Sequence, residues 1–561
     1  MAVLIFSAGA YAQTVVQIAD ADLQENQEYT WTSDNVYLLT EMIFVKPGSV
    51  LNIEPGTVIQ GVFGSGNSAT GLVVTQGAKI YAEGTAEDPI IFTSEFDDGT
   101  LTELDRGLWG GVVILGYAST NNPTADGTKL VEGVNEIANP EAYARYGGTV
   151  DNDTSGVLRY VSIRHTGINV GDAAGNEIQG LTLGGVGSGT VIEYVESIAS
   201  NDDGFEFFGG TVNTRYLVSA FNTDDAFDWD EGFRGKHQYW FAIQSPGNPD
   251  DGYGRAAEMD GATGDENTSP IARPVINNAT YLGAGIDATN NAGDGEQLLI
   301  FRDNTGGEYY NSIFGDHAGL GISIESQGSV ADFDSKTRLE EGDLILQNNL
   351  WWGFGAGNTI TDFAADDGDD DQTHTRDYLS NAVNGNRVAD PAFEGISRTA
   401  GSNGLDPRPS AGSPALDASA VKDLTDPFFD NNDYVGAFAP NNLWITGWTA
   451  LDELGYVSQV SVSNEDEVGS DVPSSITLQQ NYPNPFNPTT NISFSLPQAQ
   501  KVTIKVYNML GQEVATLANQ QRFGAGSNQV VFDAADFSSG VYIYRLVSNN
   551  TTITRKMTLI K

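Results

Sequence analysis

The chain of 561 residues lacks cysteine and contains only four histidines, His165, His237, His317 and His374. The absence of cysteine excludes a disulfide framework, thiolate metal sites and a cysteine nucleophile. The histidines are scattered, and neither an HExxH motif nor a paired spacing indicates zinc. The chain has no GxSxG motif, and its glycine-rich runs lack the Lys-Ser/Thr ending of a phosphate-binding loop. The best-known motifs of zinc peptidases, α/β-hydrolases and P-loop enzymes are therefore missing.

Basic residues are scarce, with 27 Lys and Arg against 75 Asp and Glu, so the formal net charge is −48. A nucleic-acid partner is excluded, because too little basic surface remains to neutralise phosphates. No segment has the ~20 consecutive apolar residues of a membrane-spanning helix, so no membrane span is expected. The acidic excess indicates either a solvated surface in a saline medium or a surface that binds cations.

What the sequence does contain is a repeat of 22 residues. Residues 192–213, IEYVESIASNDDGFEFFGGTVN, align without a gap with residues 214–235, TRYLVSAFNTDDAFDWDEGFRG. Aromatic, Ser, Asp and Gly positions coincide between the two lines. This period is too short for a helix pair, and the leucine-rich pattern is absent. The repeat is therefore typical of successive coils of a parallel β-helix.

Short β-branched runs broken by Pro-Gly turns extend this pattern toward the N-terminus. Here the sequence resembles the secreted right-handed parallel β-helix proteins of bacteria. The residues that carry the resemblance are Val45, Gly48, Leu51, Ile53, Pro55, Gly56, Thr57, Ala82, Glu83, Gly84, Thr85, Pro89, Ile90 and Phe92. The resemblance covers roughly residues 31–395 and implies a fold but no single activity, because lyases, hydrolases, adhesins and inert stalks share it.

Residues 474–561 contain several short alternating strands at regular spacing, which predicts a small immunoglobulin-like β-sandwich. This segment closely resembles the C-terminal sorting domain (type A) of the type IX secretion system. The matching stretches are Tyr482-Pro483-Asn484-Pro485-Phe486-Asn487-Pro488, Tyr507-Asn508, Leu510-Gly511-Gln512-Glu513-Val514, Ser539-Gly540-Val541-Tyr542 and Lys556 to Lys561. The resemblance implies the type IX machinery as a partner. It also implies export through the periplasm to the cell surface or the medium.

The expected fold class is therefore all-β, a right-handed parallel β-helix followed by a small β-sandwich. Ala10-Tyr11-Ala12 has the small residues of a signal-peptide cleavage site. Residues 458–473 are polar and acidic without apolar periodicity, as in a linker. The predicted parts are a signal-peptide remnant (1–12), a β-helix with an N-terminal cap and loop insertions (13–395), an irregular segment that covers the last coil (396–457), a linker (458–473) and the sorting domain (474–561).

The alternation in the repeat predicts which side chains face the core. Phe205 and Phe207 flank Glu206, and Phe227 and Trp229 flank Asp228, so one set points inward. We expect the aromatic set inside, because a buried unpaired carboxylate costs far more than an exposed ring.

Acidic residues also coincide at the offset of the repeat, and coils of a β-helix lie ~4.8 Å apart. Like charges at that distance repel by about 1 kcal/mol in water. The repeat itself contains only two basic residues, Arg215 and Arg234. Raised carboxylate pKa values, turn hydrogen bonds or Ca²⁺ could each offset the repulsion, and our hypothesis is that a divalent cation such as Ca²⁺ binds against this face. The candidate ligands are Asp202, Asp203, Glu206, Asp224, Asp225 and Asp228. The alternative is that Asn and Asp merely form tight turns on a solvated acidic face.

Three functions remain open at this stage. The first is a non-enzymatic, secreted or cell-surface protein that binds glycan or extracellular matrix, as an adhesin does. The second is a polysaccharide lyase or glycoside hydrolase; Asp202-Asp203 and Asn222-Thr223-Asp224 are similar to carboxylates of β-helix polygalacturonases, but their Gly-His-Gly and Arg-Ile-Lys stretches are missing. The third is a structural surface-layer component. The consecutive aromatics Tyr239-Trp240-Phe241 and Trp351-Trp352 suit either stacking on sugars or packing under a long loop. No catalytic residue is predicted.

Overall fold

The computed structural model divides the chain into two compact units, Met1–Gln459 and Val460–Lys561. The structure describes residues 13–121, 123–125, 127–134, 143–170, 177–246, 253–289, 295–327, 333–368, 373–458, 477–478, 481, 484, 486–496, 500–508, 512–523, 526–535, 537–548 and 551–561. The predicted signal-peptide remnant, and the predicted linker beyond Ser458, lie outside the described residues. In the described part of the chain, no helix is long and apolar enough to cross a membrane.

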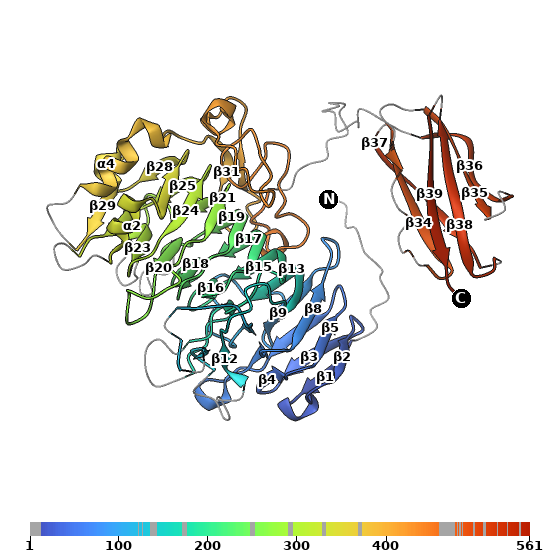
Figure 1. Ribbon diagram of the computed structural model, residues 1–561, viewed down its shortest axis with the longest axis horizontal. Helices are drawn as coiled ribbons and strands as arrows, with labels where there is room; N and C mark the ends of the chain where they lie inside the picture. The colour runs from blue at the N-terminus through green and yellow to red at the C-terminus, as the bar shows by residue number, and fades with distance from the viewer. Residues whose placement is uncertain are drawn as a thin grey trace. The chain divides into compact units, whose positions relative to one another are not determined.

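The first unit is a parallel β-helix, whose coils lie side by side in Figure 1. One of its faces is a ten-stranded sheet in which every neighbouring pair is parallel. Its strands are β4 (Met42–Val45), β7 (Gly71–Val74), β10 (Val112–Leu115), β14 (Leu181–Gly184), β16 (Phe205–Phe208), β18 (Phe227–Asp230), β20 (Ala257–Asp260), β23 (Gln297–Arg302), β26 (Leu320–Glu325) and β29 (Ala364–Asp367).

A sheet of 18 strands supplies the other two faces. Its strands are β1 (Thr14–Ile18), β2 (Glu28–Trp31), β3 (Asn35–Leu39), β5 (Val50–Ile53), β6 (Val58–Gly61), β8 (Lys79–Glu83), β9 (Ile90–Ser94), β13 (Gly156–Arg164), β15 (Val191–Ile198), β17 (Asn213–Ala220), β19 (Lys236–Ile243), β21 (Val275–Asn277), β22 (Thr280–Leu282), β24 (Gly307–Tyr310), β25 (Ile313–His317), β27 (Leu344–Gln347), β28 (Leu350–Phe354) and β30 (Arg387–Val388). Strand β13 pairs with β8 through its first half and with β9 through its second. It therefore turns a corner between two faces.

The corner residue in the long strands is a tyrosine in the left-handed conformation. Tyr160, Tyr194, Tyr216 and Tyr239 have φ values of 49°, 56°, 57° and 62°. This conformation is uncommon for a bulky residue. Here the rings stack on one another, with centroids 4.5, 4.3 and 4.7 Å apart along the series. Stacking of this kind contributes favourable energy that offsets the strain of the corner.

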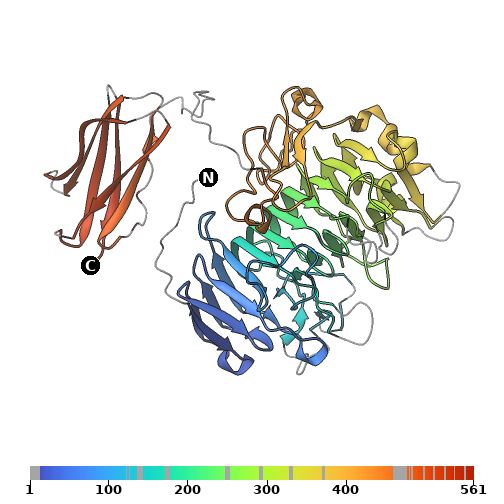
Figure 2. The ribbon, with the colours of Figure 1, turned by 180° about the vertical axis from the view of Figure 1, so that it is seen from behind.

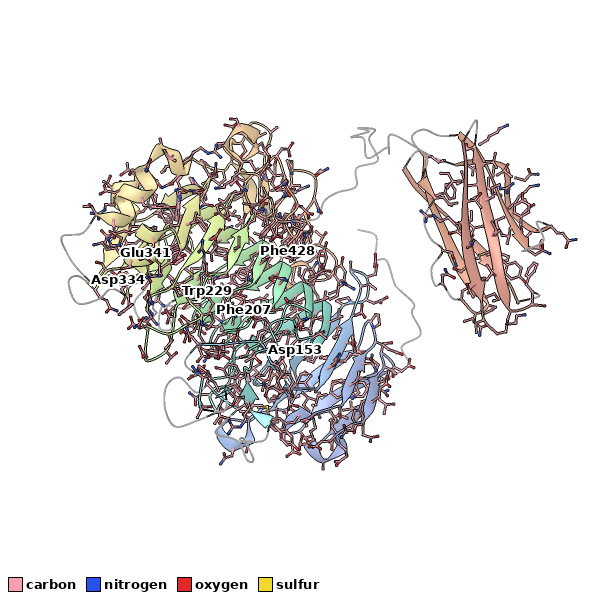
Figure 3. All side chains as sticks on the ribbon, viewed as in Figure 1. Asp153, Phe207, Trp229, Asp334, Glu341 and Phe428 are labelled. Atoms are coloured by element: carbon pink, nitrogen blue, oxygen red, sulfur yellow. The ribbon has the colours of Figure 1, made fainter. Side chains whose placement is uncertain are left out.

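The observed register confirms the repeat. Strand β15 pairs with β17 at the offset of the alignment, and β16 pairs with β18 at the same offset. The predicted core is also confirmed, because the side chains of Phe205, Phe207, Phe227 and Trp229 are fully buried. Figure 3 labels Phe207 and Trp229 among the central coils.

The segment 396–457, predicted to cover the last coil, contacts that coil where the Arg387 guanidinium of β30 donates to the Pro414 carbonyl at 3.0 Å. It packs along the side of the coils, where its Trp444 and Trp448 meet the corner tyrosines edge-on. Tyr239 and Phe241 are buried in the same cluster, so this aromatic run packs under a long segment.

Short elements complete the first unit. They are the helices α2 (Ser335–Glu341), α3 (Ile360–Phe363), α4 (His374–Ser380) and α5 (Ala450–Glu453), the strand pairs β11 (Lys129–Leu130) with β12 (Arg145–Tyr146) and β31 (Phe393–Ile396) with β32 (Leu405–Pro409), and short 3₁₀ turns. Tyr146 and Val131 of the insertion around β11 and β12 share an apolar cluster with Val113 and Phe208 of the ten-stranded sheet. The insertion therefore covers part of that sheet's outward side.

The second unit consists of two antiparallel sheets, which Figure 2 shows from behind. One contains β33 (Thr477–Leu478), β34 (Thr489–Leu496) and β37 (Gly526–Asp533), and the other contains β36 (Glu513–Phe523), β35 (Gln500–Asn508), β38 (Gly540–Ser548) and β39 (Thr551–Leu559). Side chains from both sheets form one apolar cluster. This is the layer arrangement of a β-sandwich.

Candidate cation-binding site

The predicted acidic residues lie on the outward side of the ten-stranded sheet. Glu206 on β16 is in register with Asp228 on β18, and Glu258 on β20 continues the row. Their neighbours along each strand point into the aromatic core, so alternation turns the carboxylates outward. Asp202 and Asp203 lie in the turn before β16. Turn and strand thus bring their carboxylates to one place.

The carboxylate oxygens form two groups of three that share one residue. Asp202, Asp203 and Asp224 form the first group, and Asp203, Glu206 and Asp228 form the second. In each group the three oxygens lie within 4.8 Å of one another. The structure therefore brings together five of the six predicted ligands.

The sixth predicted ligand, Asp225, belongs to neither group. Its carboxylate accepts a hydrogen bond from the Arg255 backbone at 3.0 Å and pairs with the Arg255 guanidinium at 3.3 Å. Its own N–H donates to Asp203 at 2.8 Å. Asp225 therefore positions Asp203 while its own charge is balanced by an arginine.

Burial makes this cluster unusual. Asp203 and Glu206 are only 7% and 6% exposed, whereas Asp202 and Asp224 are partly exposed. Glu206 Oε2 and Asp228 Oδ1 are buried and accept no hydrogen bond from the described residues. An unpartnered buried carboxylate oxygen carries the full cost of losing water. A cation bound there would remove that cost.

The pKa values of the cluster are shifted in the same sense. Burial first, and neighbouring carboxylates second, raise the pKa of Asp202, Asp203, Glu206 and Asp228 well above their usual range. Burial also raises the pKa of Glu132 and Glu231, which lie nearby, to about 7. Without a counter-charge, these groups hold protons at pH values where carboxylates are normally ionised.

Positive charge reaches the acidic face from residues that the sequence did not single out. Arg255 pairs with Glu258 at 2.7 Å as well as with Asp225, and Lys129 of the insertion pairs with Glu231. The offset between β18 and β20 is longer than the period of the repeat, so the alignment of the two coils did not place Arg255 there. No sequence signal pointed to Lys129, because it lies outside the repeat.

The two arginines within the repeat point elsewhere. Arg215 pairs with Asp430 at 2.6 Å, and Arg234 lies 3.6 Å from Asp151. They do not neutralise the cluster, in agreement with the expectation that the repeat cannot balance its own charge.

A second acidic group was not predicted. Glu266, Asp303 and Glu325 bring three oxygens within 4.8 Å, and all three residues are partly exposed. The Gln327 side-chain amide donates to Glu325 at 2.8 Å and to Glu266 at 3.1 Å. Because protein donors already bind two of these three carboxylates, this group needs a cation less than the first cluster does.

Comparison with known proteins identifies both units. Residues 480–561 match the secretion system C-terminal sorting domain. The protein is therefore exported by the type IX system, with whose machinery this domain interacts, to the cell surface or the extracellular space. No curated protein and no solved structure matches the chain. Residues 23–390 match the pectate-lyase-like β-helix domain. The chain thus belongs to the family of pectate-lyase-like β-helix domains, here joined to a secretion sorting domain.

Proposed function

We propose that the protein binds a carboxylated glycan outside the cell through Ca²⁺ on the acidic face, and that it does not cleave this glycan. The observation that carries the proposal is the pair of buried, unpartnered oxygens, Glu206 Oε2 and Asp228 Oδ1, beside Asp203. The cluster contains carboxylate oxygens that can serve as ligands of a cation. None of the described residues donates a hydrogen bond to these two oxygens.

The donor set favours calcium. All ligands are carboxylate oxygens, which suit hard cations, whereas zinc sites use His and Cys. Ca²⁺ binds oxygens at about 2.3–2.6 Å, so two of its ligands lie at most about 5 Å apart. The limit of 4.8 Å within each group fits this requirement.

The rim of the cluster supports binding of a ligand from solution. Asp202 and Asp224 are partly exposed, unlike Asp203 and Glu206 behind them. A cation bound to Asp203, the residue that both groups share, lies beside this rim and keeps coordination positions for oxygens of the glycan. Because the net charge of −48 repels an acidic glycan, binding depends on the cation.

The arginines of the coils support binding without cleavage. A β-eliminating lyase needs a base, yet Arg302 pairs with Asp260 at 2.9 Å and with Glu258, and these partners raise the pKa of Arg302. Arg164 and Arg215 are also paired with carboxylates. Ion pairing keeps the Arg302 guanidinium protonated, so it does not act as a base.

Hydrolysis is disfavoured by the same geometry. Glycosidases hold two carboxylates about 5–5.5 Å or about 6.5–9.5 Å apart, with the sugar between them. Here Asp203 and Glu206 are more than nine-tenths buried, and one oxygen of each residue lies within 4.8 Å of the others in its group. A metal ion fits between these oxygens, and a sugar ring does not.

The test combines calorimetry with a binding assay. Purified full-length protein is titrated with CaCl₂ at moderate salt, then applied to immobilised polyuronate with calcium or with EDTA. We expect binding heat, retention only with calcium, and no release of reducing ends. Glu206→Gln should abolish the heat and the retention, whereas the matched control Glu325→Gln in the second acidic group should preserve both. If calcium binding releases or absorbs heat but the protein is not retained on polyuronate, the cation has only a structural role. If reducing ends are released from the polyuronate, the protein is an enzyme.

A further inference from the structure

The sorting domain reverses the charge of the rest of the chain. Its four-stranded sheet contains one acidic residue, Glu513, against six basic ones, although acidic residues outnumber basic ones almost three to one overall. The basic residues of these strands are Lys501, Lys505, Arg522, Arg545, Arg555 and Lys556. An excess of this kind on a small sheet indicates a surface selected for charge.

Strand alternation gathers most of this charge on one side. Val502, Ile504 and Val506 of β35 point into the sandwich core. The alternate residues Lys501 and Lys505 are therefore on the outward side, and both are at least partly exposed.

The neighbouring strands extend the same side. Arg545 alternates with the core residues Tyr544 and Leu546 on β38, and Lys556 precedes the core residue Met557 on β39. Both basic side chains are exposed. They continue the basic surface across three adjacent strands.

The register places like charges side by side. Lys505 lies directly opposite Arg545, and Lys556 lies opposite Ile543, two residues from Arg545. Like charges that face each other across strands destabilise a sheet. This arrangement concentrates positive charge on one exposed side of the sheet.

The centre of this surface has the chemistry of a protein contact. The Arg545 guanidinium lies 5.0 Å from the centroid of the Tyr507 ring. Ile543 and Val547 lie on the same side and are partly exposed. Arginine and tyrosine dominate binding hot spots, which have an apolar centre within a polar rim. A membrane surface or a polyanion would require charge but not this centre.

We propose that the basic face, defined as Lys501, Lys505, Tyr507, Arg545 and Lys556, docks onto a carboxylate-rich protein surface of the type IX machinery during export. Opposite charge steers the exported chain to its receptor and excludes wrong orientations. The Arg545–Tyr507 pair then supplies the short-range contact. This inference is independent of the cation site.

The test uses full-length protein in cells that carry the type IX system. The fraction on the surface or in the medium is compared with the fraction in the periplasm. We expect Lys505→Glu combined with Arg545→Glu to reduce export at least tenfold, close to the effect of deleting residues 474–561. The charge-conserving pair Lys505→Arg and Arg545→Lys should be exported. A control with the same change in charge on the β-helix, Lys79→Glu with Lys336→Glu, should also be exported.

Export of the double variant at the normal level would overturn the proposal. Thermal melting of each purified variant separates docking from folding. If the double variant melts at a lower temperature, the single variant Arg545→Gln is tested instead, provided that its melting temperature is unchanged. Reduced export of this variant supports docking, and normal export refutes it. Normal export together with Arg545-dependent binding to vesicles containing phosphatidylglycerol would assign the face to lipid instead.

Discussion

Two stacks of side chains run along the same coils of the β-helix, and they behave oppositely. The aromatic stack, Tyr160, Tyr194, Tyr216 and Tyr239, lies at the corner of the long strands, with centroids 4.3–4.7 Å apart. The acidic cluster lies on the ten-stranded face, where Glu206 stands in register with Asp228. Both follow from repeating one residue type at one position of the coil.

A parallel β-helix places residues of the same type next to one another in successive coils. It therefore repeats the interaction of that residue type with itself, whether this is attractive or repulsive. Coils ~4.8 Å apart place aromatic rings at a favourable contact distance. The same spacing forces carboxylates to repel, and this repulsion adds to the effect of burial in raising their pKa values. The aromatic stack therefore stabilises the coils by itself, and the tryptophans of the side segment cover it. The acidic cluster is stable only with protons, arginine or a cation.

The largest expected effect is a loss of stability with rising pH in calcium-free protein. The pKa values of Glu132 and Glu231 are raised from 4.5 to about 7, and those of the cluster are raised as well. A carboxyl with a raised folded-state pKa favours folding fully below its unfolded pKa, and this contribution is lost as pH rises through the folded pKa. Denaturant unfolding should therefore show falling stability from about pH 4.5 to above pH 7, and calcium should flatten the profile. A flat profile without calcium would show that the cluster carries no such strain.

The next largest effect concerns the core that both stacks surround. Phe227 is fully buried, with its ring centroid 5.3 Å from Phe205 and 4.4 Å from Trp240. Phe227→Ala should destabilise the first unit by about 3–5 kcal/mol. Equilibrium unfolding in guanidinium, followed by tryptophan fluorescence, measures the loss. A loss below about 1 kcal/mol would place the ring outside the core.

The aromatic stack itself should show a smaller effect. Tyr216 stacks on Tyr194 and Tyr239, and each such pair contributes about 0.5–1.5 kcal/mol. Tyr216→Ala should therefore cost about 2 kcal/mol, and Tyr216→Phe should restore most of it because the ring is kept. If the Phe variant is as unstable as the Ala variant, the hydroxyl rather than the stack stabilises the corner.

The smallest effect has the opposite sign. Glu206→Gln removes a carboxylate opposite Asp228 and should stabilise calcium-free protein at pH 8 by about 1 kcal/mol. The same variant should lose the calcium-dependent rise in melting temperature. Scanning calorimetry with and without calcium measures both results. A variant that is less stable without calcium and still responds to it would contradict the view of Glu206 as a strained ligand.

Much of this architecture could be predicted from the sequence, because a coil is a local unit. The constant offset of the repeat predicted the pairing of β15 with β17 and of β16 with β18, and alternation predicted that Phe227 and Trp229 face inward. The sorting motifs predicted the destination. The boundaries of the linker and the cleavage site, and the identity of the ligand, stay predictions.

The balance of charge could not be predicted in the same way. Arg255 reaches Asp225 across a coil that is longer than the repeat, and Lys129 reaches Glu231 from an insertion outside the repeat. The position of the segment containing Trp444 along the side of the coils depended on aromatic area contributed by several coils together.

The sequence by itself determined the coil, its interior and its acidic row, because a constant period and alternation along each strand are local properties of the chain. Only the tertiary structure decided which basic side chains contact the row of carboxylates, how deeply these carboxylates are buried and which surfaces remain exposed to solvent. Those features depend on where insertions of unequal length, such as the one around β11 and β12, come to lie once the coils have stacked.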